Sequence, residues 1–216
     1  DVYKRQEEAQ RFLELLEQEP MQWRVFFTLA IYGGFRRGEL FGFEWKDVDF
    51  DSGVITVSRT SNYTPDRGVF TDTPKTKGSQ RSLKLSDSVM QLLRQYRAEQ
   101  TAERLRLGSQ WVDSDRLFTS WNGAVIHPSS ASNWLERFCG RTGMRKVNVH
   151  SFRHLNASLL INSGADVKTI SAVLGHAQTT TTLNIYAHTF AVAQAKATDA
   201  VADALSLKKG SKINTK

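Results

Sequence analysis

The segment NVHSFRHLNASLLINSG, residues 148–164, combines a helix signature with a cluster of ionisable side chains. Asn148 is a residue type that caps the start of a helix, and Gly164 is one that ends a helix. At about 100° per residue, the side chains between them separate onto two faces. The apolar face holds Phe152, Leu155, Leu159 and Leu160, and the polar face holds His150, Arg153, His154 and Ala157. The segment therefore predicts a helix over residues 149–163 that packs one face on a core.

His150 and Arg153 are three residues apart, so both side chains can address one point beside this helix. An imidazole next to a guanidinium forms an anion site with a proton donor or acceptor at hand. An isolated pair of this kind is also common on a solvated helix face. The spacing of His150 and His154 is that of a zinc protease helix, but that motif needs a glutamate where Ser151 stands. We therefore expect no metal site.

The rest of the chain predicts an α+β fold that is mostly helical. A charged helix is expected over residues 4–18, and a second one begins at Pro20 and ends at Gly33-Gly34. Between Gly53 and Leu85, the segments GVITVSR, DRGVF and QRSLKL predict a small antiparallel sheet of three strands. A long helix follows from Ser86 to about Leu107. The remaining expected elements are an extended segment RLFTS and helices over 129–141, 149–163, 167–174, 180–187 and 189–206.

Composition narrows the choice of partner. The chain has 216 residues, of which 40% are hydrophobic, and a net charge of +7. Such a basic excess favours nucleic acid or an anionic membrane surface. No run of 18 apolar residues and no secretory signal is present, so nucleic acid is the better interpretation. The single cysteine, Cys139, excludes an internal disulfide and fits a reducing cytoplasm. Because the chain starts at Asp1 rather than methionine, we expect it to be part of a longer protein.

Three further motifs accompany the helix. GGFRRGEL, residues 33–40, places Arg36 at a glycine turn, with Glu39 close enough to hold it; an ordinary surface arginine would look the same. TPKTKGSQRSLKL places Lys75 and Lys77 at a hairpin tip, where lysines are usually solvated. LGHAQTTTTLNIYAH, residues 174–188, puts a tyrosine ten residues after a Gly-His pair, although a half-buried structural tyrosine is the alternative.

Together and in this order, these motifs resemble the catalytic domain of tyrosine recombinases, the phage integrase family. WKDVDFDSGVITV and PKTKGSQRSLKL look most like integrases of phages and conjugative transposons of Gram-positive bacteria. The resemblance covers about residues 20–190. It implies a tyrosine recombinase catalytic domain over 20–207, preceded by a helix or linker over 1–19 and followed by a basic tail over 208–216.

The resemblance also implies a reaction and a role for each motif. Tyr186 would attack a DNA phosphodiester and form a 3′-phosphotyrosyl link, without metal or cofactor. Its catalytic partners would be Arg36 and Arg153 as phosphate-binding cations, His150 as proton acceptor, Lys75 as proton donor and His176 as a further phosphate ligand. Lys77 is the alternative proton donor. Glu39 and His154 would support these residues, and Lys77 and Arg81 would contact DNA.

The implied partners are double-stranded DNA carrying a recombination site and other protomers, with a tetramer on DNA and no membrane. The implied function is the integration or excision of a mobile element in the bacterial cytoplasm, at the nucleoid. Two alternatives stay open: a type IB topoisomerase-like strand transferase, and a DNA-binding remnant whose catalysis is unused. FAVAQAKATDAVADALSL, residues 190–207, has an incomplete apolar stripe of small residues. We expect it to dock on a neighbouring subunit, with packing on its own domain as the alternative.

Overall fold

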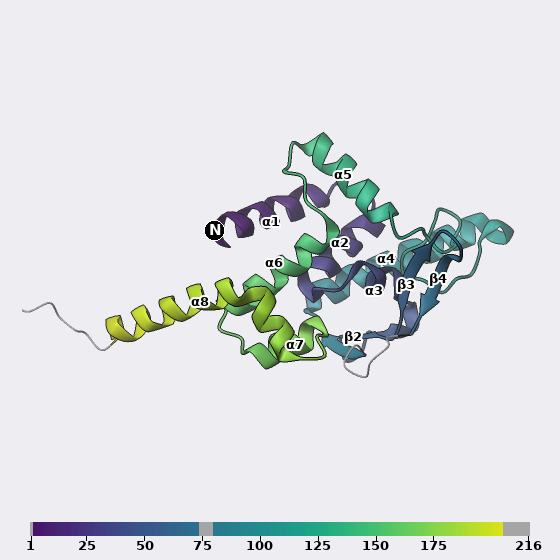
Figure 1. Cartoon of the computed structure of the whole chain (residues 1–216). Coiled ribbons are helices and arrows are strands. Elements are labelled where there is room, and N and C mark those ends of the chain that lie inside the picture. The colour runs from purple at the N-terminus through teal and green to yellow at the C-terminus, as the bar shows by residue number, and fades with distance from the viewer. Residues whose placement is uncertain (1, 74–79, 205–216) are drawn as a thin grey trace, which may run out of the picture.

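The computed structural model describes residues 2–73 and 80–204, and helices make up most of it (Figure 1). This confirms the expected class, α+β and mostly helical. Lys75 and Lys77 lie outside the described residues. The helices are α1 (Val2–Leu16), α2 (Met21–Gly33), α3 (Arg37–Gly42), α4 (Asp87–Leu107), α5 (Ser130–Thr142), α6 (Val149–Asn162), α7 (Val167–Leu174) and α8 (Thr179–Ala204), with short 3₁₀ turns η1 (Trp45–Asp47) and η3 (Gly108–Gln110).

The strands form two small antiparallel sheets rather than one. β1 (Val48–Asp49), β2 (Val54–Val57) and β5 (Arg81–Lys84) make a three-stranded sheet in the order β1-β2-β5. β3 (Thr60–Thr64) and β4 (Gly68–Asp72) pair with each other as a separate hairpin.

The expected sheet is therefore wrong in one respect. GVITVSR and QRSLKL do pair, but DRGVF pairs with residues 60–64, a strand that the sequence did not indicate. The reason is local: Gly68 has φ +66°, and with the turn before it this glycine closes a tight hairpin. β4 therefore pairs with β3, the strand next to it in sequence, rather than with a strand that is distant in sequence.

Aromatic rings join α1 to the main core. Phe12 of α1 lies 5.5 Å from Phe27 of α2 and 4.8 Å from Phe152 of α6, measured between ring centroids. Phe12 and Phe27 are almost fully buried, and each contributes on the order of 2–3 kcal/mol of hydrophobic stabilisation. Residues of α1 thus share the core of the rest of the chain.

A second, smaller core fastens the C-terminal helices onto α6. Its buried members are Ala157, Ile161, Ile170, Leu174 and Tyr186. Tyr186 as a whole residue is 6% exposed. The tyrosine singled out from the sequence is therefore part of the packing between α6, α7 and α8.

α8 has a break at Tyr186. The sequence predicted two helices, over 180–187 and 189–206. The structure has two helical segments that meet at a kink at Tyr186, whose angles are not helical, φ −113° and ψ 18°, so the expected division into two helices is confirmed to within two residues. Beyond the break the helix extends away from the body of the molecule (Figure 1). Among the described helices, none combines the length and apolarity needed to cross a membrane.

Candidate active site

Three arginine side chains converge on the C-terminal turn of α7. Gly175, at φ +64°, closes this turn, and the carbonyl oxygens of 173, 174 and 175 are left pointing outward. Each accepts from one arginine: Val173 O from Arg81 Nε at 2.7 Å, Leu174 O from Arg153 Nη2 at 2.6 Å, and Gly175 O from Arg36 Nη2 at 3.3 Å. The negative end of the helix dipole favours cations at this position. One short turn thus gathers guanidinium groups from three distant parts of the chain.

Arg36 and Glu39 are paired as the sequence predicted. Arg36 is the residue before α3, and its backbone N–H donates to Glu39 Oε2 at 2.8 Å. Its Nη1 donates to Oε1 of the same carboxylate at 2.8 Å. Burial raises the pKa of Glu39, but hydrogen bonds and charge from Arg81 and then Arg36 outweigh it and hold the pKa below its usual value. Glu39 is thus an ionised anchor, while the Arg36 side chain stays 40% exposed.

Arg153 is buried at the centre of the cluster. Its Nη1 donates to Gly34 O at 2.7 Å, and its Nη2 reaches His176 Nε2 at 3.0 Å. Burial, followed by repulsion from Arg36, lowers its pKa to about 10. Arg153 therefore remains charged at neutral pH.

His176 is held as a neutral imidazole. Because arginine only donates, the Nε2 atom facing Arg153 accepts, and the proton sits on Nδ1, which is 2.8 Å from Thr182 Oγ1. Burial and the charges of Arg153, Arg36 and Arg81 lower its pKa to about 4. The family resemblance implied a phosphate contact from His176. In the structure its Nε2 is taken by Arg153.

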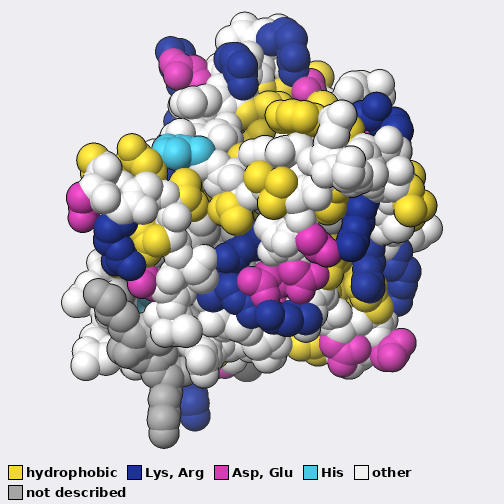
Figure 2. Space-filling model, turned by 90° about the vertical axis from the view of Figure 1, so that its right-hand side faces the viewer, with side chains coloured by type: hydrophobic (Ala, Val, Ile, Leu, Met, Phe, Trp, Pro, Cys, Tyr) yellow, Lys and Arg dark blue, Asp and Glu magenta, His cyan; other side chains and the backbone are white. Residues whose placement is uncertain are grey.

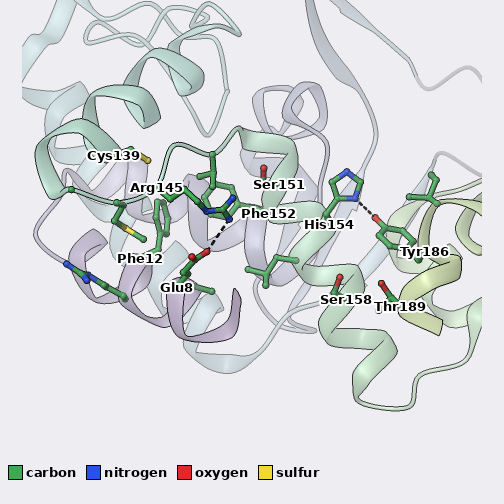
Figure 3. Close-up of a pocket in the computed structure, with 17 residues that line it drawn as sticks. Glu8, Phe12, Cys139, Arg145, Ser151, Phe152, His154, Ser158, Tyr186 and Thr189 are labelled. Atoms are coloured by element: carbon green, nitrogen blue, oxygen red, sulfur yellow. Dashed lines mark hydrogen bonds and ion pairs between the residues drawn. The ribbon is translucent and has the colours of Figure 1, made fainter. Parts of the chain in front are cut away.

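The hydroxyl of Tyr186 is 3.0 Å from Nδ1 of His154. Figure 3 shows the two side chains pointing at each other from α6 and α8. Burial raises the pKa of the Tyr186 phenol, and the charge of Arg153 offsets part of this. The ring of His150 packs edge-on against His154, with centroids 4.7 Å apart. His154 therefore contacts the hydroxyl of Tyr186 directly, whereas we expected it only to support the catalytic residues.

His150 is exposed on the first turn of α6. Burial of part of its ring lowers its pKa, and the charges of His154, Arg153 and Arg36 lower it further. It is therefore neutral at pH 7, the form in which an imidazole accepts a proton.

Arg81 occupies a different place from the DNA-facing one that we expected. Its side chain is 7% exposed, and Nη1 and Nη2 donate to Glu39 Oε1 and Oε2 at 3.0 and 2.9 Å. Lys75 and Lys77, the expected proton donors, are not among the described residues. Within residues 2–73 and 80–204, no three His, Cys, Asp or Glu side chains are grouped as a metal site needs. Metal independence stays a prediction.

A cavity of about 540 Å³ opens beside Tyr186 and His154 (Figure 3). Its far end carries an ion pair between Glu8 of α1 and Arg145, 3.1 Å apart. Sequence reasoning missed both residues, because neither belongs to a motif. On another face, shown in Figure 2, basic, acidic and apolar side chains are interspersed. The charge on that face does not single out a DNA surface.

Comparison with known proteins agrees with the resemblance. Residues 3–192 match the model of the phage integrase family. The ICEBs1 integrase of Bacillus subtilis strain 168 is 29% identical over 201 residues, which cover 93% of this chain and 54% of that protein. A XerC-like tyrosine recombinase of Caldanaerobacter subterraneus subsp. tengcongensis is 31% identical over 193 residues, covering 84% of this chain and 49% of that protein. The chain spans about half the length of these relatives.

Solved structures agree on the fold. The Tn1549 transposon integrase in complex with transposon right end DNA is 24% identical, with a TM-score of 0.74, over 87% of this chain and 62% of that one. XerA recombinase is 25% identical, with a TM-score of 0.63, over 82% of this chain and 57% of that one. From the match over residues 3–192 and these relatives, the chain belongs to the phage integrase family.

Proposed function

We propose that the chain is the catalytic part of a site-specific DNA recombinase that integrates or excises a mobile element by cutting and rejoining DNA strands. The observation that carries this proposal is the pairing of the Tyr186 hydroxyl with an imidazole beside a cluster of arginines. A buried tyrosine of purely structural role needs a hydrogen-bond partner, which His154 could supply, but it does not need the neighbouring cluster of arginines. Its relatives are named as integrases and recombinases, and the proposal extends that activity to this chain.

The proposed reaction begins with a DNA phosphodiester at the arginine cluster. Charge gathers on the nonbridging oxygens of the phosphate in the transition state, and preorganised guanidinium groups stabilise it. Arg36 is partly exposed and charged, and Arg153 lies behind it with His176. Tyr186 attacks the phosphorus, forms the 3′-phosphotyrosyl bond and breaks the bond to the 5′ oxygen. That oxygen needs a proton on leaving, and we assign Lys75 as donor, with Lys77 as the alternative.

The phenolic proton must go to a base, because free tyrosine has a pKa of about 10. We assign His150, which is exposed on the first turn of α6, the helix that also carries Arg153. His154 holds the hydroxyl until then.

The test is covalent capture of DNA. Sites selected with the full-length protein supply a nicked duplex that traps the cleaved strand, and a denaturing gel then separates protein–DNA adducts. We expect an adduct with the wild type and none with Tyr186→Phe, while Tyr63→Phe, which alters an exposed tyrosine on β3, retains it. An adduct that persists in Tyr186→Phe refutes the assignment. No adduct with the wild type would favour the unused remnant.

The product distinguishes recombination from topoisomerase-like action. A recombinase joins strands between two copies of its site, whereas a type IB topoisomerase relaxes any supercoiled circle. We expect recombinant product from a plasmid carrying two sites and no relaxation of a plasmid that lacks them. Relaxation of both plasmids would favour the alternative.

We further propose assembly as a tetramer on DNA in the bacterial cytoplasm, at the nucleoid, with the end of α8 docking on a neighbouring subunit. Support comes from the exposed apolar residues beyond the break, Val192 at 37% and Val201 at 57%. Truncation after His188 in the full-length protein should abolish synaptic complexes while the domain stays folded. Unchanged assembly and cleavage would leave packing on its own domain as the better account.

A further inference from the structure

Arg81 connects two parts of the site that are far apart in sequence. It is the first residue of β5, paired with Val57 of β2, so its backbone is fixed by the sheet. Its guanidinium donates to both oxygens of Glu39, 42 residues away, and to the carbonyl of Val173, 92 residues away. Glu39 belongs to the Arg36 motif and Val173 to the turn before His176. Arg81 thus joins the two motifs through one rigid, planar group.

The backbone of α7 leaves room for this guanidinium. A Cβ atom built on Gly175 would lie 2.5 Å from Nη1 of Arg81, so the guanidinium would have to move from its present position. Gly175 also takes φ +64°, which glycine adopts without strain. The turn is therefore shaped both for its own closure and for close contact with Arg81.

Arg36 and Arg81 share the carboxylate of Glu39, and this sharing limits how many hydrogen bonds the Arg36 side chain makes to it. Oε1 of Glu39 accepts from Arg36 Nη1 and Arg81 Nη1, and Oε2 accepts from the Arg36 backbone and Arg81 Nη2. With Arg81 present, Arg36 holds the carboxylate through only one side-chain nitrogen. Without Arg81, a buried carboxylate would have Arg36 as its remaining arginine partner and would draw it into a two-pronged pair. That movement would withdraw Arg36 from a bound phosphate.

We infer that Arg81 is a positioning residue of the strand-transfer site: it occupies Glu39 and braces the turn at 173–175, so that Arg36 and Arg153 face one phosphate. The inference rests on the proposed function and replaces direct DNA contact as the role of Arg81. It predicts that loss of Arg81 lowers the rate of the chemical step and leaves DNA affinity nearly unchanged.

The main experiment compares Arg81→Met and Arg81→Lys with Arg104→Met, a control that removes an exposed arginine paired with Asp113. Single-turnover cleavage of the nicked duplex is measured at saturating protein, with DNA affinity and melting temperature in parallel. We expect Arg81→Met to cleave about 10- to 100-fold more slowly, the scale set by small misplacements of reacting groups. Arg81→Lys should recover little, because an ammonium cannot span Glu39 and Val173 together. Arg104→Met should match the wild type.

DNA with an uncharged scissile linkage tests whether Arg81→Met slows cleavage by weakening the stabilisation of charge on the phosphate. A methylphosphonate carries no negative charge, so it depends less on Arg36. The ratio of wild-type to Arg81→Met rates should therefore shrink on this linkage. An equal ratio on both linkages would indicate a merely structural defect and overturn the inference.

A measurement on the wild-type chain keeps the inference testable if the variants do not fold. The Arg81 Nε–H donates to Val173 O, so its NMR signal should exchange slowly with water, with and without duplex DNA. Rapid exchange would overturn the inference, as would wild-type rates in Arg81→Met or a loss confined to DNA affinity. If the wild type forms no adduct at all, the proposed function fails instead, and the NMR result still stands for or against the bracing contact.

Discussion

Nδ1 of His154 lies 3.0 Å from the hydroxyl of Tyr186, and the ring of His150 packs edge-on against the His154 ring. The tyrosine thus faces two imidazoles in series, and the order of their roles can be measured. Since we assign His150 as the proton acceptor, His150→Gln should slow cleavage by about 10²- to 10⁴-fold. His154→Gln should cost no more than about 10-fold, because it removes a holding contact only. Single-turnover rates decide, and the reverse order would make His154 the base.

The pH dependence of cleavage should follow His150. Burial and then the charges of His154, Arg153 and Arg36 lower its pKa below the usual 6.5. A base works when it is unprotonated, so the rate should fall as the buffer becomes more acidic, with its midpoint below pH 6.5. The check is a rate profile from about pH 5 to 8.5 at constant ionic strength. A midpoint above 6.5 would contradict the assignment.

Protonation of His176 should make the free energy of unfolding depend on pH between about 4 and 6.5. Its pKa is about 4 in the folded chain, against about 6.5 for an unperturbed histidine. Between these values the unfolded chain binds the proton and the folded chain does not, so the free energy of unfolding falls as the pH drops from 6.5 to 4. Partial solvent exposure reduces the effect to about 1–2 kcal/mol. Urea unfolding of wild type and His176→Gln at pH 7 and pH 5 measures it, and equal slopes with pH would refute it.

Two glycines offer a matched pair for the α7 turn. Gly175 and Gly164 both have positive φ, but only at Gly175 would a new Cβ meet another group, Arg81 Nη1. Both alanine variants should lose about 1–2 kcal/mol from backbone strain. Gly175→Ala should lose more than this and should also slow cleavage, while Gly164→Ala cleaves normally. Denaturant unfolding and adduct rates test this, and equal behaviour of the two variants would count against the shaped turn.

Cleavage should survive removal of divalent metal. The site gathers arginines where a phosphoryl-transfer enzyme would otherwise place magnesium. We expect the same adduct yield with and without EDTA. If EDTA abolishes the adduct and magnesium restores it, the mechanism assigned here is wrong.

Local patterns predicted the helices well. The helix expected over 149–163 is α6, Val149–Asn162, because its cap and apolar face lie within one segment. β3 could not be predicted in this way. Its residues Thr60 to Thr64 are mostly polar, and only pairing with β4 makes them a strand. The kink of α8 lies at Tyr186, two residues before the division expected from the sequence, and packing of Tyr186 on α6 rather than a local glycine or proline accompanies it.

In the candidate site, too, contacts between residues close in sequence could be predicted, and contacts between distant residues could not. The pairing of Arg36 with Glu39 spans three residues, and helical spacing predicted it. The inward position of Arg81 depends on partners 42 and 92 residues away. No local pattern distinguishes a guanidinium that turns inward from one that meets DNA. The contact between His154 and Tyr186 likewise appears only when α6 and α8 are placed side by side.

Arg81, Arg153 and Arg36 donate to the backbone oxygens of residues 173–175, so their positions depend on the backbone of this turn rather than on its side chains. A carbonyl is present whatever the side chain, so exchanging Val173 for another β-branched residue leaves the acceptor of Arg81 intact. A change in the length of α7 would have a larger effect, because one inserted residue would rotate the turn by about 100° and move all three acceptors together. The acceptors of the three arginines should therefore survive an exchange of Val173 for another β-branched residue, but not a change in the number of residues in α7.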